Sequence, residues 1–99
     1  MIKSERIAAA MRCVDRANFV LDMYYKAAYE DSPLPIDHNA TISAPHMHAY
    51  AMSQLESKLV PGARVLDVGS GSGYLCAAFY ELCKDPITKK ANIVGIEHI

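Results

Sequence analysis

The stretch Val65-Leu66-Asp67-Val68-Gly69-Ser70-Gly71-Ser72-Gly73 decides the fold class of this 99-residue chain. Residues 64–68 form a short apolar run with β-branched side chains, which is typical of a buried parallel strand. The three glycines that follow allow a tight turn, in which the backbone can approach a ligand without steric conflict from Cβ atoms. We therefore predict a strand that leads through a glycine-rich turn into a helix.

The residues after the turn complete a strand–helix–strand unit. A helix beginning near Gly73 would have an apolar face, formed by Leu75, Ala78, Phe79 and Leu82. Residues 84–91 then form the return loop, and residues 92–96 form a second strand. Such a βαβ unit is parallel and right-handed, so the sequence predicts the α/β class.

The N-terminal region begins with a helix over residues 4–16, for which Ser4 is a candidate N-cap. Residues 17–29 have no clean period, and the prolines of the segment 33–35 prevent a helix from continuing there. Residues 36–43 are predicted to be an ordered loop with short extended pieces.

A second helix opens at Pro45, where a missing amide proton costs little. Pro61-Gly62 ends it. Its predicted buried stripe consists of Met47, Ala51, Leu55 and Leu59. We divide the chain into an N-terminal helical and loop region, residues 1–62, and the start of a nucleotide-binding domain, residues 63–99.

The glycine turn points to a ligand with an amino-acid group. A pyrophosphate-binding turn needs glycine or alanine where this chain has Tyr74, and the turn lacks the lysine of a P-loop. Asp67 can accept hydrogen bonds from a ligand ammonium, while the amides at the helix start suit a carboxylate. Glu97, after the second strand, can accept from both hydroxyls of a ribose. Together these groups describe S-adenosylmethionine; the alternative is a plain glycine turn with a solvated Glu97.

A longer pattern resembles one methyltransferase family. The segment Ala40-Thr41-Ile42-Ser43-Ala44-Pro45-His46-Met47-His48-Ala49 looks like the signature of the protein-L-isoaspartate O-methyltransferases. Four other stretches continue the resemblance in order: Val14-Asp15-Arg16 with Phe19-Val20, Tyr29-Glu30-Asp31, residues 65–74 and residues 94–99. The resemblance implies the Rossmann-like fold of S-adenosylmethionine-dependent methyltransferases, of which this chain would hold the N-terminal helical segment and the first βαβ unit.

The resemblance also implies a reaction and a set of site residues. The family transfers the methyl group of S-adenosylmethionine to the carboxylate of L-isoaspartyl residues, which begins the repair of damaged proteins. Ser43 corresponds to the family's active-site residue. The cofactor contacts implied by the resemblance are Thr41, Ile42, Ser43, His48, Asp67, Gly69, Gly71, Ser72, Gly73, Glu97 and His98. Isoaspartyl-containing proteins and peptides would be the substrates.

Other interpretations of these residues remain open at the level of sequence. From chemistry alone, a serine before Ala44-Pro45 is more typical of a helix cap than of a catalytic hydroxyl. His46 and His48 do not share a helical face, so we expect no metal site. Two other functions compete with isoaspartyl methylation: another class I methyltransferase, and a non-catalytic nucleotide-binding module.

Composition and length add further expectations. A net charge of −1 gives no electrostatic footprint for nucleic acid, and no segment has the apolar length of a membrane span. Three cysteines fit no paired framework, and the N-terminus does not resemble a secretory signal, so we expect a cytoplasmic protein with free thiols. Two strands cannot make a complete methyltransferase sheet. We expect a fragment of a longer, monomeric enzyme, which alone binds the cofactor weakly and turns over little or nothing.

Overall fold

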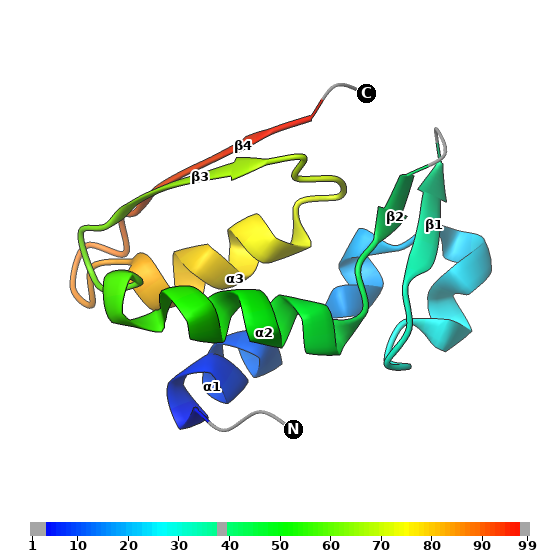
Figure 1. The fold of residues 1–99 in the computed structure, drawn as a ribbon, viewed down its shortest axis with the longest axis horizontal. Helices are drawn as coiled ribbons and strands as arrows, with labels where there is room; N and C mark the ends of the chain where they lie inside the picture. The colour runs from blue at the N-terminus through cyan, green and yellow to red at the C-terminus, as the bar shows by residue number, and fades with distance from the viewer. Residues whose placement is uncertain (1–3, 38–39, 98–99) are drawn as a thin grey trace.

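The parallel pair of strands predicted around the glycine turn is present. The computed structural model describes residues 4–37 and 40–97. Strand β3 (Arg64–Val68) pairs in parallel with β4 (Asn92–Ile96), in a register that runs from Arg64 opposite Asn92 to Val68 opposite Ile96. Helix α3 (Tyr74–Cys83) connects them and lies along one face of the sheet (Figure 1). The predicted βαβ unit is confirmed.

The other face of this two-stranded sheet is open. Its side chains are each more than half exposed: Leu66, Val68, Val94 and Ile96. The two strands are therefore buried on the α3 side alone, where Val65 and Ile93 pack against the core. The predicted burial of the strands therefore holds for one face only.

Short helical segments fill the N-terminal region. Helix α1 (Glu5–Cys13) begins at its predicted cap, because the Ser4 hydroxyl accepts a hydrogen bond from the Ile7 amide at 3.3 Å. The aperiodic residues that follow form two 3-10 helices, η1 (Arg16–Phe19) and η2 (Asp22–Ala27). The tighter turn of a 3-10 helix explains why these residues lack the α-helical period.

Helix α2 (Pro45–Leu55) starts where Pro45 predicts it, and the 3-10 turn η3 (Glu56–Lys58) follows it. The predicted buried stripe is confirmed at Leu59, which is buried, but is wrong within α2. Met47 is 51% exposed and Leu55 is 45% exposed, whereas Met52 is fully buried and His48 is buried beside it. Helix α2 carries apolar side chains on several sides, so packing rather than the sequence pattern selects the inward face.

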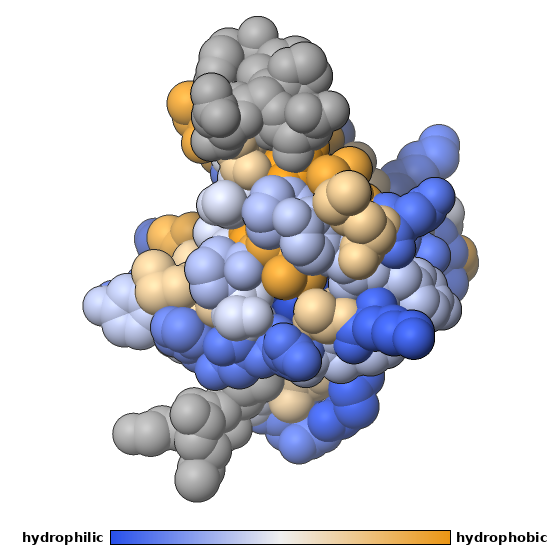
Figure 2. Space-filling model, turned by 90° about the vertical axis from the view of Figure 1, so that its right-hand side faces the viewer, coloured by the Kyte–Doolittle hydropathy of each residue, from blue (hydrophilic) through white to orange (hydrophobic). Residues whose placement is uncertain are grey.

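The short extended pieces predicted within residues 36–43 are present, and they belong to two paired strands. Strands β1 (Leu34–Asp37) and β2 (Ala40–Ile42) pair antiparallel, with an irregularity between Pro35 and Asp37. This hairpin lies against the glycine turn: a Cβ atom added to Gly71 would stand 3.3 Å from Ile36 Cδ1 and 3.8 Å from the Thr41 carbonyl oxygen. Figure 2 views the molecule from this end, where hydrophilic residues cover much of the surface and hydrophobic ones gather nearer its centre.

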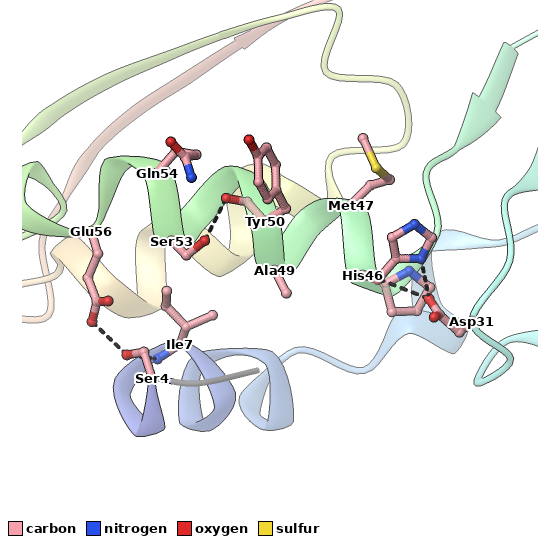
Figure 3. Close-up of a pocket in the computed structure, with 11 residues that line it drawn as sticks. Ser4, Ile7, Asp31, His46, Met47, Ala49, Tyr50, Ser53, Gln54 and Glu56 are labelled. Atoms are coloured by element: carbon pink, nitrogen blue, oxygen red, sulfur yellow. Dashed lines mark hydrogen bonds and ion pairs between the residues drawn. The ribbon is translucent and has the colours of Figure 1, made fainter. Parts of the chain in front are cut away.

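One core joins the N-terminal helices to the βαβ unit. It includes Ile7 of α1, Met52 of α2 and Phe79 of α3, all nearly inaccessible to solvent. A hollow of about 950 Å³ runs along the outer side of α2, between its residues 45–54 and the start of α1 (Figure 3). Within the described part of the chain, no helix has the length and apolar character needed to cross a membrane.

Candidate functional site

A smaller cavity, of about 230 Å³, lies where the glycine turn meets the junction between β2 and α2. It gathers residues from three segments that are distant in the sequence. Its lining consists of Thr41, Ile42, Ser43, His48, Asp67, Gly69, Ser70, Gly71, Ser72, Tyr74 and Leu75. Eight of the residues expected from the sequence are thus brought together around one space.

The glycine turn owes its shape to a left-handed backbone. Gly69, Gly71 and Gly73 have φ values of 80°, 57° and 91°, which favour glycine. The amides of Gly69 and Ser70 both donate to the Ile96 carbonyl, at 2.8 and 3.0 Å, and so fasten the turn to the end of β4. Gly73 is the N-cap of α3 and has no side chain that could accept hydrogen bonds from the first amides of the helix. The helix start is therefore suited to an anionic ligand group.

Asp67 lies at the end of β3, on the cavity wall. The Cys76 thiol donates to its Oδ2 at 3.6 Å. Burial, together with the nearby Asp67 carboxylate, raises the pKa of Cys76, which keeps the sulfur protonated at neutral pH. Cys76 thus acts as a weak donor that orients the carboxylate, whereas Cys83 is fully buried.

Glu97 follows β4 and contacts the turn rather than standing apart from it. Its Oε1 accepts a hydrogen bond from the Gly71 amide at 2.7 Å. The acid predicted for a ribose therefore also ties the end of β4 to the glycine turn. His98, the last of the expected cofactor contacts, lies outside the described residues.

Ser43 is exposed on the cavity rim and does not cap α2. The N-cap position belongs to Ala44, and the Asp31 Oδ1 accepts the hydrogen bond from the His46 amide at 2.9 Å. The same oxygen lies 2.9 Å from His46 Nδ1 (Figure 3). The cap interpretation of Ser43 is therefore wrong, because a carboxylate from a distant loop already fills that role. These hydrogen bonds also lower the pKa of Asp31, the His46 amide contributing most.

His48 forms a buried part of the wall. It is 7% exposed, and its ring stacks on Tyr74 with centroids 4.7 Å apart. Burial, reinforced by the charge of Arg16, lowers its pKa to about 4, so the imidazole is neutral at pH 7. The contribution of Tyr74 was not predicted: its ring also meets Phe19 edge-on, with centroids 5.6 Å apart. A tyrosine at the first position of a helix after a glycine turn is the signal that could have suggested it.

Three buried polar atoms have no hydrogen-bond partner in the described structure: Arg16 Nε, His48 Nδ1 and Ser72 Oγ. Such atoms are costly to leave unsatisfied inside a protein. His48 and Ser72 both line the cavity, so they could pair with a ligand that enters it. Over residues 4–37 and 40–97, no cluster of three or more histidine, cysteine or acidic side chains could hold a metal ion.

Comparison with known proteins identifies the family of this chain. The family model "Protein-L-isoaspartate(D-aspartate) O-methyltransferase (PCMT)" matches residues 1–99. The chain belongs to the protein-L-isoaspartate O-methyltransferase family. A member from Arabidopsis thaliana, protein-L-isoaspartate O-methyltransferase 1, is 48% identical over 99 residues, which are 100% of this chain and 40% of the relative. Another, from Hyperthermus butylicus, is 51% identical over 101 residues, covering 99% of the chain and 41% of the relative.

A solved structure of the family has the same fold. The Plasmodium falciparum protein-L-isoaspartate O-methyltransferase, crystallised with S-adenosyl-L-homocysteine, matches with a TM-score of 0.84 and 37% identity, over 99% of this chain and 43% of that one. The chain thus spans about two fifths of the length of the family members it matches. Its fold is the incomplete Rossmann-like methyltransferase fold expected from the sequence.

Proposed function

We propose that these residues form part of an enzyme that transfers the methyl group of S-adenosylmethionine to the free carboxylate of L-isoaspartyl residues in damaged proteins. One observation carries the proposal: the signature segment around Ser43 and the glycine turn face the same cavity. A site for a reacting carboxylate and a site for the methyl donor would then adjoin. The family to which the chain belongs supports both the methyl donor and the carboxylate substrate of this proposal.

The cavity suits S-adenosylmethionine by the chemistry of its lining. Asp67 would accept from the ligand ammonium, and the uncapped start of α3 would receive its carboxylate. His48 Nδ1 and Ser72 Oγ, both buried without a hydrogen-bond partner among the described residues, supply two further polar atoms. The P. falciparum relative holds S-adenosyl-L-homocysteine, the demethylated form of this cofactor. We assign the cofactor contacts to Thr41, Ile42, Ser43, His48, Asp67, Gly69, Gly71, Ser72, Gly73, Glu97 and His98.

The remaining catalytic task is mostly one of placement. When bound, S-adenosylmethionine supplies a methyl group activated by its sulfonium charge. The substrate carboxylate is already ionised at neutral pH, so this chain needs no strong base. Ser43, exposed on the rim, would orient that carboxylate through its hydroxyl. Good placement can lower such a barrier by up to about 7–11 kcal/mol.

The neutral state of His48 fits this role. A protonated imidazole beside a sulfonium would set two positive charges together in a poorly solvated space. Burial holds the pKa of His48 at about 4, which avoids this repulsion at physiological pH. His48 would therefore line the cofactor site as a neutral hydrogen-bonding side chain, and would not act as an acid or base.

The proposal extends to the cellular setting. We place the protein in the cytoplasm, where its three cysteines, all free thiols, would stay reduced. We expect a monomer that acts on isoaspartyl proteins and peptides and binds no nucleic acid. The near-neutral net charge of −1 supports that last expectation.

Calorimetric titration with S-adenosyl-L-homocysteine tests the proposed cofactor binding. The titrated sample is a chimaera in which residues 1–99 replace the matched region of the A. thaliana relative, and the 99-residue chain is titrated in parallel. We expect the chimaera to bind and Asp67→Asn to weaken binding at least about tenfold, the loss of one charge-assisted hydrogen bond. Asp22→Asn, in exposed η2, is the control and should leave affinity unchanged. Absence of binding, or equal affinity for both variants, would contradict the proposal.

A further inference from the structure

Arg16 is a buried cation held by backbone carbonyls. It is 4% exposed. Its Nη1 donates to the carbonyls of Ala28 and Glu30, at 2.6 and 3.0 Å, and its Nη2 to those of Ser32 and Ser43, at 2.7 and 3.3 Å. Among the described residues, no carboxylate forms an ion pair with it. One side chain thus gathers three carbonyls of the loop before β1 and one from the candidate active-site serine.

The chemistry of this contact is specific to arginine. Burial lowers the pKa of Arg16, but a guanidinium stays protonated in proteins. Its planar fork of donors can meet several carbonyls at once, whereas a lysine ammonium is a compact charge on a flexible stem. Because a buried charge without partners is costly, the four carbonyls must stay in place around it.

A second connection runs from the same loop to α2. Asp31 lies between Glu30 and Ser32, whose carbonyls Arg16 holds. Its Oδ1 accepts from the His46 amide, at the first turn of α2 (Figure 3). Arg16 therefore acts on the junction of β2 and α2 directly, through the Ser43 carbonyl, and indirectly, through Asp31. That junction carries Ser43, and one turn later His48.

We propose that Arg16 is a positioning residue for this site: its guanidinium fixes the backbone at Ser43, and thereby sets where the Ser43 hydroxyl meets the substrate carboxylate. This inference rests on the proposed function of the cavity. Among the described residues, Arg16 donates to no atom of the glycine turn or of Asp67, so this part of the cofactor site should persist without it.

A matched control exists elsewhere in the fold. The Arg6 guanidinium also bridges two carbonyls, those of Leu59 and Leu82, and lies 3.6 Å from Glu56. These contacts fasten α1 to the ends of η3 and α3, and none of the residues involved lines the 230 Å³ cavity. Loss of Arg6 should therefore loosen the fold without moving Ser43.

The experiment compares Arg16→Met, Arg16→Lys and Arg6→Met. Hydrogen exchange of the 99-residue chain reports the placement itself: Arg16→Met should speed exchange at the amides of His46, Met47 and His48, and Arg6→Met should not. In the chimaera, Arg16→Met should lower kcat for an isoaspartyl peptide at least about tenfold, as expected for a shift of about 1 Å in a reacting group. The affinity for S-adenosyl-L-homocysteine should fall much less than kcat, because the contacts that the glycine turn and Asp67 offer the cofactor are untouched.

Each outcome decides the inference. Arg16→Met with unchanged kcat and exchange overturns it, as does a loss of kcat that Arg6→Met reproduces at equal loss of thermal stability. If Arg16→Met does not fold, Arg16→Lys decides: a folded protein with reduced kcat supports the inference, and wild-type kcat overturns it. If the wild-type chimaera methylates nothing, the proposed function fails, while the exchange data still test the placement of Ser43.

Discussion

His48 stacks on Tyr74, with ring centroids 4.7 Å apart and planes inclined by 26°. The contact joins α2, which follows the signature segment, to the first residue of α3, which follows the glycine turn. It therefore fixes the two halves of the cavity relative to each other. Because His48 is buried, its protonation also makes the stability of the fold depend on pH.

Acid should destabilise the chain through His48. Its pKa is lowered from 6.5 to about 4 in the folded state, so the unfolded state binds more protons between these values. The contribution of neutral His48 to the free energy of unfolding is complete above pH 6.5. It is lost as the pH falls toward 4, which lowers the free energy of unfolding by up to about 3 kcal/mol. Urea unfolding between pH 4 and 7 measures this loss.

His48→Gln should flatten that pH dependence, because the titrating group is gone. Gln54→Ala, an exposed change in the same helix that leaves both histidines in place, should keep the slope of the wild type. Equal slopes for His48→Gln and the wild type would show that another group carries the effect.

The ring of Tyr74 should matter more than its hydroxyl. Tyr74 is nearly buried and contacts both His48 and Phe19 through its ring. Tyr74→Ala should cost about 3–5 kcal/mol of unfolding free energy, as expected for a buried aromatic side chain. Tyr74→Phe keeps both ring contacts and should cost much less. The idea fails if the two variants are equally destabilised in chemical denaturation.

Gly95 should tolerate no side chain. A Cβ atom there would lie 2.7 Å from Cys76 Sγ and 2.9 Å from both Cβ and Oγ of Ser70. Gly95→Ala should therefore destabilise the fold by about 1–3 kcal/mol, the usual cost of overpacking. Adding Cys76→Ala removes the nearest atom and should recover part of that loss. A thermal melt of the single and double variants gives the comparison, and a fully stable Gly95→Ala would count against the close packing.

The register of α2 is open to a paired test. Met52 is fully buried, whereas Met47 is 51% exposed. Met52→Ala should cost about 2–5 kcal/mol, and Met47→Ala should change the free energy of unfolding little. The opposite order would restore the stripe that the sequence pattern predicts.

This register shows where the sequence was informative and where it was not. The bounds of β3 and β4 follow from local chemistry, since β-branched runs and glycines act within a few residues. The inward face of α2 depends instead on α1 and α3, which pack against it, and its apolar side chains surround much of the helix. Short extended pieces were predicted where β1 and β2 lie, but their pairing was not, because the prolines obscure such short strands.

The site divides in the same way. The motif residues around Ser43 and Gly71 were identified by their pattern, and the fold brings them to one cavity. The supporting residues were not, because their roles depend on distant partners. Arg16 meets Ser43 across 27 positions, and Asp31 caps a helix 15 positions away. No local spacing encodes such contacts.

Ser43→Ala should separate chemistry from cofactor binding. If the Ser43 hydroxyl orients the substrate carboxylate, its loss should lower turnover of the chimaera by about 10²-fold or more, and should lower the affinity for S-adenosyl-L-homocysteine far less. Steady-state kinetics and calorimetry measure the two quantities. Unchanged turnover together with unchanged cofactor affinity would remove Ser43 from the active site.

The central claim is that this site methylates isoaspartyl carboxylates. The most direct measurement uses two peptides that differ in a single linkage, one isoaspartyl and one aspartyl, incubated with the chimaera and with S-adenosylmethionine labelled on its methyl group. We predict that base-labile methyl ester forms on the isoaspartyl peptide and not on its aspartyl twin. Equal methylation of both peptides, or of neither while S-adenosyl-L-homocysteine still binds, would contradict the claim.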